Sequence, residues 1–126
     1  MKAKILVVDD SSMARRTLRR ILEQAEYLVI EAEDGIAAIE RYFLEKPDLV
    51  MLDMVMEGIS GLETLSKLRE MDPGVQVLVA TADIQDSTRE MAEAAGGRGL
   101  VNKPFSSEKV LMVVNAILEG GRDATD

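Results

Sequence analysis

The stretch Leu49-Val50-Met51-Leu52-Asp53 decides the fold, because four large apolar residues run without a break into a carboxylate. An unbroken apolar run of this length is typical of a strand that is buried on both faces of a parallel sheet. An ionised side chain inside such a run costs several kcal/mol unless a partner neutralises it or it stands at the strand's end. We therefore expect Asp53 to lie at the carboxyl end of a buried strand, among other polar groups.

The composition is that of an ordinary globular domain. The 126 residues are 47% hydrophobic and 30% charged, which is enough for one domain with its own core. No apolar stretch approaches the roughly 20 residues that cross a bilayer. The chain starts directly in a strand pattern, so we expect no signal peptide. The absence of cysteine suits a reducing compartment, and we expect a cytoplasmic protein.

The charge balance narrows the set of partners. The formal net charge is −8, which repels nucleic-acid backbones and anionic membranes, so we expect neither as a partner. The chain has no histidine. The commonest acid–base group and the commonest nitrogen ligand for zinc are therefore both missing. A bound metal would be a hard cation that is held by oxygen atoms.

Apolar periodicity predicts five strands that alternate with five helices. The expected strands are 4–8, 27–30, 49–53, 75–80 and 100–102, and the expected helices are 13–25, 36–46, 62–71, 86–95 and 108–119. Strict alternation implies a parallel sheet with helices on both faces. We therefore expect one domain over residues 1–120, followed by a short tail at 121–126.

Helical spacing predicts the inward face of each helix. The residues expected to point inward are Leu18, Ile21 and Leu22 in the first helix, Ile36, Ile39 and Phe43 in the second, Leu62, Leu65 and Leu68 in the third, Met91 in the fourth, and Val110, Leu111, Val113, Val114, Ile117 and Leu118 in the fifth. The arginines of the first helix are expected to turn mostly elsewhere. Because the fourth helix has one large apolar residue, we expect it to be thinly anchored and to shift at low cost.

Polar residues follow four of the predicted strands. In parallel α/β sheets the functional residues lie beyond the carboxyl ends of the strands, near the point where the strand order reverses. The residues that this rule gathers are Asp9 and Asp10 after the first strand, Asp53 after the third, Thr81 after the fourth and Lys103 after the fifth. Glu31 ends the second strand, and it would lie to one side if that strand is at the edge.

The gathered side chains fit phosphoryl chemistry. Three carboxylates at close range repel one another unless a cation neutralises them, and an all-oxygen donor set points to Mg2+. A carboxylate beside Mg2+ and a lysine can act as a nucleophile toward phosphorus. Thr81 and Lys103 would then be the donors to the phosphoryl oxygens.

Each polar residue also has a structural explanation when it is taken alone. Asp9-Asp10 and Thr81 fit helix caps, Asp53 fits a strand-end turn, and Lys103 fits a solvated turn. The coincidence of polar groups at all four strand ends nevertheless favours a functional site.

Four motifs, in this order, resemble the receiver domain of two-component response regulators. They are Val7-Val8-Asp9-Asp10-Ser11, Pro47-Asp48-Leu49-Val50-Met51-Leu52-Asp53, Ala80-Thr81-Ala82 and Lys103-Pro104-Phe105. The resemblance runs from about residue 4 to residue 118 and is strongest to single-domain, chemotaxis-like receivers. It implies an α/β fold of flavodoxin-like type: a doubly wound (βα)5 three-layer sandwich whose five-stranded parallel sheet has the order 2-1-3-4-5.

The resemblance also implies a role for each acid. Asp53 would be the phospho-acceptor, which receives a phosphoryl group from the phosphohistidine of a histidine kinase. Asp10 and Asp53 would ligate Mg2+ directly, together with the backbone carbonyl of Val55. Asp9 would act largely through water.

The resemblance implies that the remaining motif residues interact with the phosphoryl group. Thr81 would be the switch hydroxyl that moves toward it, and Lys103 would contact it through a turn in which the Lys103–Pro104 peptide bond is cis. Two positions depart from the family pattern: Leu100 stands where an aromatic residue is usual, and Met56-Glu57 stands where Met-Pro is usual.

A receiver of this kind would be a signalling protein rather than an enzyme, although it assists its own phosphotransfer and a slow hydrolysis of the acyl phosphate. The added charge would shift an equilibrium between two arrangements. The implied output is a target protein that binds the fourth helix, fifth strand and fifth helix, where Met112 lies on the outer side. A phosphatase is a further expected partner, and the expected state is a monomer or a weak, phosphorylation-dependent dimer.

Two alternatives stay open at this point. A Mg2+-dependent phosphohydrolase with an aspartate nucleophile would use the same groups, but such enzymes usually carry nucleophile and acid two residues apart, whereas Asp9 and Asp10 are adjacent. The chain could also be a receiver cut from a larger, DNA-binding regulator.

Overall fold

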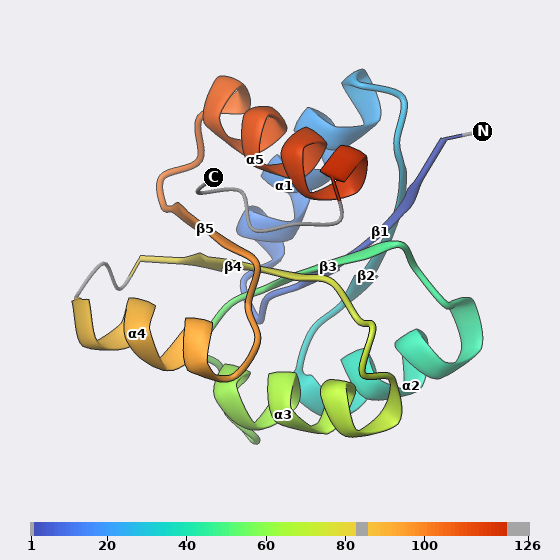
Figure 1. Ribbon diagram of the computed structural model, residues 1–126. Helices are drawn as coiled ribbons and strands as arrows, with labels where there is room; N and C mark the ends of the chain where they lie inside the picture. Colours follow the sequence, from blue (N-terminus) through green and yellow to red (C-terminus); the bar gives the residue numbers. More distant parts are fainter. Residues whose placement is uncertain (1, 83–85, 121–126) are drawn as a thin grey trace.

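Five parallel strands form one sheet, and helices cover both of its faces (Figure 1). The computed structural model describes residues 2–82 and 86–120, so the tail expected at 121–126 lies outside the described residues. The strands are β1 (Lys4–Val8), β2 (Leu28–Ala32), β3 (Leu49–Leu52), β4 (Val77–Thr81) and β5 (Gly99–Asn102). The helices are α1 (Ser12–Gln24), α2 (Gly35–Glu45), α3 (Gly61–Met71), α4 (Asp86–Ala94) and α5 (Ser107–Gly120).

The strand order is β2-β1-β3-β4-β5, which confirms the predicted topology. The chain leaves β1 for β2 on one side and returns to β3 on the other, so the order reverses between β1 and β3. At this reversal point Val8 pairs with both Ala32 and Leu52. The next residues after β1 and β3 are Asp9 and Asp53, and the topology therefore places the two acids side by side.

The two faces of the sheet support two separate cores. Alternate strand residues point to opposite faces, so Ile5 and Val7 pack with α1 and α5, whereas Leu6 and Val8 pack with α2 and α3. Figure 1 shows α1 and α5 on one side of the sheet and α2, α3 and α4 on the other. The predicted three-layer sandwich is confirmed.

The inward faces of α1 and α5 are as predicted. The buried residues are Leu18, Ile21 and Leu22 in α1 and Val110, Val114 and Ile117 in α5, and Leu111, Val113 and Leu118 pack against the same core. In α3, Leu65 and Leu68 are buried, while Leu62 is only half-buried. Met112 is exposed on the outer side of α5.

The predicted face of α2 is wrong at two of its three positions. Ile36 and Phe43 are 64% and 67% exposed, and the helix instead buries Ala38 and Tyr42. Ile39 packs against the core, as predicted. The start of α2 approaches α3 closely, since a Cβ atom on Gly35 would lie 2.2 Å from Thr64 Oγ1. The buried face of α2 is therefore the one that carries Gly35, Ala38 and Tyr42 at helical spacing, and Ile36 and Phe43 lie outside it.

Polar side chains cap the N-termini of α1, α2 and α3. Ser11 caps α1, Asp34 caps α2, and Ser60 with Glu63 forms a capping box on α3.

Met91 was expected to anchor α4 but is 50% exposed, and the buried contact comes from Ala92 instead. Among the α4 side chains that the structure describes, Ala92 is the buried one, and an alanine is still a thin anchor. None of the helices in the described ranges is long and apolar enough to span a membrane.

Candidate functional site

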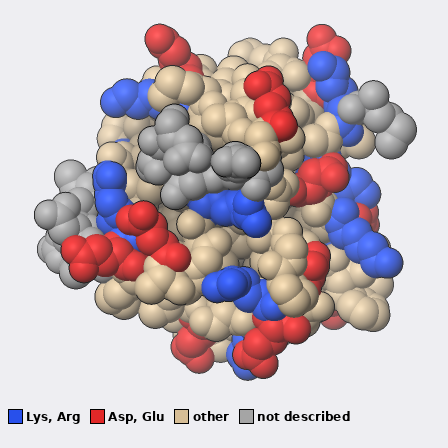
Figure 2. All heavy atoms as spheres, in the orientation of Figure 1, with Lys and Arg blue, Asp and Glu red and all other residues tan. Residues whose placement is uncertain are grey.

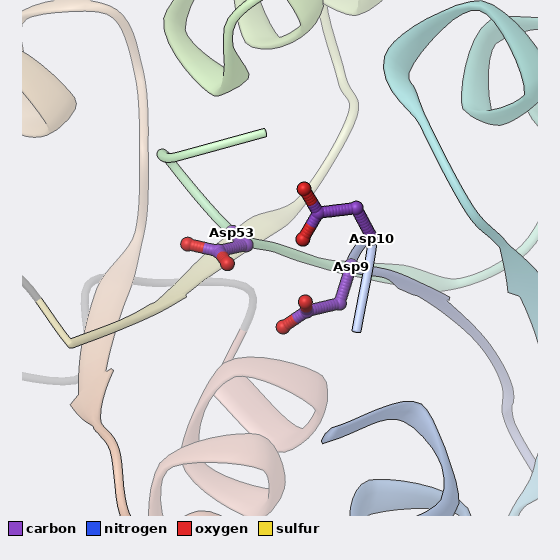
Figure 3. Close-up of side chains that lie close together, drawn as sticks. All are labelled: Asp9, Asp10 and Asp53. Atoms are coloured by element: carbon purple, nitrogen blue, oxygen red, sulfur yellow. The ribbon is translucent and has the colours of Figure 1, made fainter. Parts of the chain in front are cut away.

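Three carboxylates meet where the strand order reverses. One carboxylate oxygen from each of Asp9, Asp10 and Asp53 lies within 4.8 Å of the other two. Figure 3 shows the Asp9 and Asp10 side chains leaving the end of β1 beside Asp53, which follows β3. Asp9 and Asp53 are 1% and 4% exposed, and Asp10 is exposed. The structure thus brings together the three acids that were predicted from the strand ends.

Backbone N–H groups hold one oxygen of each acid. Ser11 N donates to Asp9 Oδ1 at 2.9 Å, in the turn that ends β1 and starts α1. Val55 N donates to Asp53 Oδ1 at 3.1 Å. Glu57 N donates to Asp10 Oδ2 at the longer distance of 3.4 Å. Asp10 is therefore the most loosely restrained acid of the three.

Lys103 provides the positive charge at this cluster. Its Nζ lies 2.8 Å from Asp9 Oδ2 and 3.0 Å from Asp53 Oδ2. The contact with Lys103 is the described partner of Asp9 Oδ2, which is fully enclosed. The Lys103–Pro104 peptide bond is cis, as predicted. One ammonium group opposes three carboxylates, so the cluster retains an excess of negative charge.

The pKa shifts reflect burial and this ion pair. Burial raises the pKa of the Asp9 carboxyl above its ordinary value, and the contact with Lys103 offsets only part of the effect. Burial by itself would lower the pKa of Lys103, but its contacts with Asp9 and Asp53 outweigh burial and leave that pKa raised. Lys103 is therefore charged at neutral pH.

Thr81 ends β4 close to the start of the Lys103 turn. Its carbonyl accepts a hydrogen bond from Lys103 N at 3.0 Å, and the residue pairs with Asn102 in the sheet. Thr81 is fully buried. The sheet thus connects the predicted switch residue directly to the lysine that contacts Asp53.

Gly61 lies against the backbone of Asp53, a role that the sequence did not indicate. A Cβ atom on Gly61 would lie 2.3 Å from the Asp53 carbonyl oxygen and 2.5 Å from Met54 Cα. Gly61 N also donates to the Met54 carbonyl at 3.2 Å. The start of α3 therefore fixes the position of the loop that carries Asp53. In the sequence, Gly61 is a glycine in a predicted loop, and this pattern alone does not indicate a contact with Asp53.

Arg15 is a second residue that the sequence reasoning missed. It was expected to turn away from the core, but its Nη1 donates to the Asp9 backbone carbonyl at 2.6 Å. Its Nε donates to Glu31 at the end of the edge strand β2 at 2.9 Å. Glu31 lies to one side of the carboxylates, as predicted, and it connects to them through Arg15.

The donor set fits Mg2+. All three side chains offer carboxylate oxygens, and the whole sequence lacks the histidine and cysteine that softer metals prefer. One oxygen from each acid lies within 4.8 Å of the other two, so the cluster is compact enough for the three side chains to face one cation.

A cavity of about 370 Å3 lies beside Asp10. It is lined by Asp10, Glu33, Asp34, Gly35, Ile36, Glu57, Gly58 and Ile59. This cavity gives the carboxylate cluster access to solvent on the side of Asp10.

Comparisons of sequence agree with this arrangement. Residues 5–115 match the response regulator receiver domain family. The chain is 37% identical to the chemotaxis protein CheY of Halobacterium salinarum, over 94% of this chain and 98% of that protein. It is also 37% identical to the transcriptional regulatory protein ResD of Bacillus subtilis, over 93% of this chain and 48% of ResD. The chain thus spans nearly all of one relative and about half of the other.

Solved structures have the same fold. The chemotaxis protein CheY4 of Vibrio cholerae superposes with a TM-score of 0.90 at 28% identity, over 94% of this chain and 100% of that chain. A two-component response regulator of the LuxR family from Aurantimonas sp. SI85-9A1 superposes with a TM-score of 0.91 at 30% identity, over 98% of this chain and 89% of that chain. Since the family match covers most of the chain and includes every strand end described above, the chain belongs to the response regulator receiver family of two-component signalling.

Proposed function

We propose that the chain accepts a phosphoryl group on Asp53 from the phosphohistidine of a histidine kinase, with Mg2+ bound beside it, and thereby changes its binding to a partner protein. The observation that carries this proposal is the placement of Asp53, which is buried at the reversal point of the sheet, beside two further acids and 3.0 Å from Lys103. We assign the receiver to residues 1–120 and the short tail to 121–126, in a cytoplasmic protein.

In the proposed transfer, a carboxylate oxygen of Asp53 attacks phosphorus. The phosphorus–nitrogen bond of phosphohistidine breaks, and its electron pair stays on the imidazole nitrogen. The product is an acyl phosphate on Asp53. Because these 126 residues contain no histidine, the phosphohistidine lies outside the receiver domain.

The proposed metal ligands are Asp10, Asp53 and the backbone carbonyl of Val55, with Asp9 acting through water. When bound, the cation would supply charge that offsets the carboxylates and the transferring phosphoryl group. Lys103 already contacts Asp9 and Asp53, and it would stay in reach of the phosphoryl oxygens on Asp53. The side chains of Asp9 and Asp53 are enclosed, which limits competing water at the acceptor.

Phosphorylation would shift the β4–α4–β5 region. The phosphoryl group adds about −1.5 to −2 charges and three acceptor oxygens. Thr81 and Lys103 are the proposed donors to these oxygens, and they are already connected through the Thr81 carbonyl. The thin anchor of α4 on Ala92 allows that helix to move at low cost.

The proposed output surface consists of α4, β5 and α5. Leu100 lines a cavity of about 320 Å3 on this surface, between α4 and β5, together with Ala92 and Gly99. Met112 is 65% exposed on α5, and a flexible methionine adapts well to a partner. We infer that a target protein binds here, that a phosphatase resets Asp53, and that the chain is a monomer or a weak, phosphorylation-dependent dimer.

The function can be tested with acetyl phosphate, a small acyl-phosphate donor, in the presence of Mg2+. Intact mass spectrometry should show one added phosphoryl group per chain, and none in Asp53→Asn. The control Glu33→Gln changes an exposed acid near the site and should label like the parent. Continuous turnover of a small phosphoester, without a labelled chain, would instead support the phosphohydrolase alternative. Labelling of Asp53→Asn would overturn the acceptor assignment.

A second experiment tests the switch. Beryllofluoride with Mg2+ mimics the bound phosphoryl group, and amide resonances of β4, α4 and β5 should shift when it is added. Thr81→Val keeps a similar shape but removes the hydroxyl, so the shifts in α4 should shrink while those beside Asp53 remain. Equal shifts in both proteins would contradict the role proposed for Thr81.

A further inference from the structure

One arginine connects the carboxylate cluster to the edge of the sheet. Arg15, in the first turn of α1, donates from Nη1 to the Asp9 carbonyl oxygen at 2.6 Å and from Nε to Glu31 Oε1 at 2.9 Å. Its side chain is only 15% exposed. Both contacts involve an ionised group, and charge-assisted hydrogen bonds of this kind are about twice as strong as neutral ones.

Glu31 holds this guanidinium group in place from β2. Its second oxygen, Oε2, accepts from Arg19 Nε at 2.6 Å. The other described contacts of Arg19 are to Glu23 Oε2 at 2.8 Å and to the Val29 carbonyl at 3.3 Å. Both arginines therefore bind Glu31, but among their described contacts Arg15 makes the one with Asp9.

The carbonyl that Arg15 holds belongs to the peptide unit between Asp9 and Asp10. A peptide unit is planar, so fixing its carbonyl direction also fixes the direction in which the chain enters Asp10. The side chain of Asp10 is exposed, and its described partner, Glu57 N, is 3.4 Å away. The contact from Arg15 is shorter and stronger, and it is therefore the better restraint on Asp10.

We propose that Arg15 is a positioning residue for the Mg2+ site. It orients the Asp9–Asp10 peptide so that the Asp10 carboxylate faces Asp53, and Glu31 keeps Arg15 in position. This inference rests on the proposed function, in which Asp10 and Asp53 hold the cation. Residues that bond to the metal ligands, and not to the metal itself, fix the orientation of those ligands. Their loss commonly weakens metal binding.

The sign of the effect separates positioning from two other roles. Arg15 carries a positive charge near the site, so a purely electrostatic role predicts that its removal tightens Mg2+ binding. A purely structural role, as a link between α1 and β2, predicts lower stability with unchanged Mg2+ affinity. Positioning predicts weaker Mg2+ binding although a repelling charge has been removed.

The test compares Arg15→Met with Arg19→Met by Mg2+ titration, followed through the amide resonances of 15N-labelled protein. Arg19→Met removes an arginine of the same helix that also binds Glu31, and it is the matched control. We expect the Mg2+ dissociation constant to rise about ten-fold in Arg15→Met and to stay close to the parent value in Arg19→Met. An unchanged or lower constant in Arg15→Met overturns the inference, as does an equal rise in both variants.

A second variant covers the case in which Arg15→Met does not fold. Arg15→Lys keeps the charge, but one ammonium cannot reproduce the two-pronged contact with Asp9 and Glu31. Its Mg2+ dissociation constant should also rise, and a parent-like value overturns the inference. If the parent chain itself shows no saturable Mg2+ response at Asp10 and Asp53, the proposed function fails and this inference fails with it.

Discussion

Lys103 Nζ lies 3.0 Å from Asp53 Oδ2, so the residue that follows β5 neutralises part of the charge that follows β3. The same Nζ lies 2.8 Å from Asp9 Oδ2. A single ammonium group therefore holds two buried carboxylates together across β4, the strand that separates β3 from β5. The stability of the site in the absence of a cation depends on this group.

Removing Lys103 should destabilise the fold in a way that Mg2+ can repair. Lys103→Met leaves two enclosed carboxylates without their counter-charge, and we expect a loss of about 1.5 to 3 kcal/mol in the free energy of unfolding. Added Mg2+ should recover more stability in this variant than in the parent, since it replaces the missing positive charge. Urea denaturation with and without Mg2+ measures both effects.

The control for this prediction is Lys67→Met, which removes an exposed lysine of α3. It should change the unfolding free energy by less than about 0.5 kcal/mol. If Lys103→Met and Lys67→Met have the same unfolding free energy without Mg2+, the ammonium group does not neutralise the cluster as described.

Gly61→Ala should disturb the loop that carries Asp53. The new methyl group would stand 2.3 Å from the Asp53 carbonyl oxygen, so the backbone has to move. We expect a loss of about 1 to 3 kcal/mol in unfolding free energy and slower phosphorylation by acetyl phosphate. Gly74→Ala is the matched control, because its nearest atom, Asp72 Oδ1, would be 3.4 Å away. Equal effects of both changes would count against a role for Gly61 in placing Asp53.

Glu31→Gln should give a stability loss that depends on pH. Burial by itself would raise the pKa of Glu31, but its hydrogen bonds with Arg19 and Arg15 outweigh burial and lower that pKa below its ordinary value of 4.5. The stabilisation is therefore present above pH 4.5 and is lost as the pH falls through the lowered pKa. Two further charged residues, Glu33 and Arg41, line a surface cavity together with Glu31, so their charges also lie near the Glu31 carboxylate.

We expect Glu31→Gln to cost roughly 1 to 2 kcal/mol at pH 7 and progressively less below pH 4.5. Denaturation curves at a series of pH values, recorded for variant and parent, measure this difference. Glu23→Gln removes the half-exposed partner of Arg19 and should cost less at pH 7. A Glu31→Gln cost that is constant from pH 7 to pH 3 would show that the charge of Glu31 does not matter.

Leu100→Phe should be tolerated. Leu100 is half-buried and lines the cavity of about 320 Å3 between α4 and β5, so a larger ring has space to occupy. We expect a change within about 1.5 kcal/mol in unfolding free energy. Val101→Phe places the same ring at a neighbouring position that is only 5% exposed, and it should cost more. Equal losses at the two positions would mean that the cavity does not admit the ring.

The order of the strands and the placement of the acids could be predicted because they depend on local pattern and general topology. The apolar run that ends in Asp53 forms β3, and the rule for parallel sheets then places Asp9 and Asp10 beside it. Lys103 followed from the same rule, since β5 is parallel to β4.

Contacts that depend on the distance between elements could not be predicted in this way. Hydrophobicity assigned Ile36 and Phe43 to the core, but the close approach of α2 to α3 at Gly35 turns a different face of the helix inward, the one with Ala38 and Tyr42. Arg15 has the sequence pattern of a surface residue. Only the fold shows that Glu31 and the Asp9 carbonyl both lie within its reach.

Peptide mapping can identify directly the residue that carries the phosphoryl group. The chain is incubated with acetyl phosphate and Mg2+, reduced with borohydride, which converts an aspartyl phosphate to homoserine, and mapped by peptide mass spectrometry. We predict homoserine at position 53, and none when EDTA removes the metal. Homoserine at position 9 or 10, or modification at position 53 that persists in EDTA, would contradict the claim that Asp53 is a Mg2+-dependent phospho-acceptor.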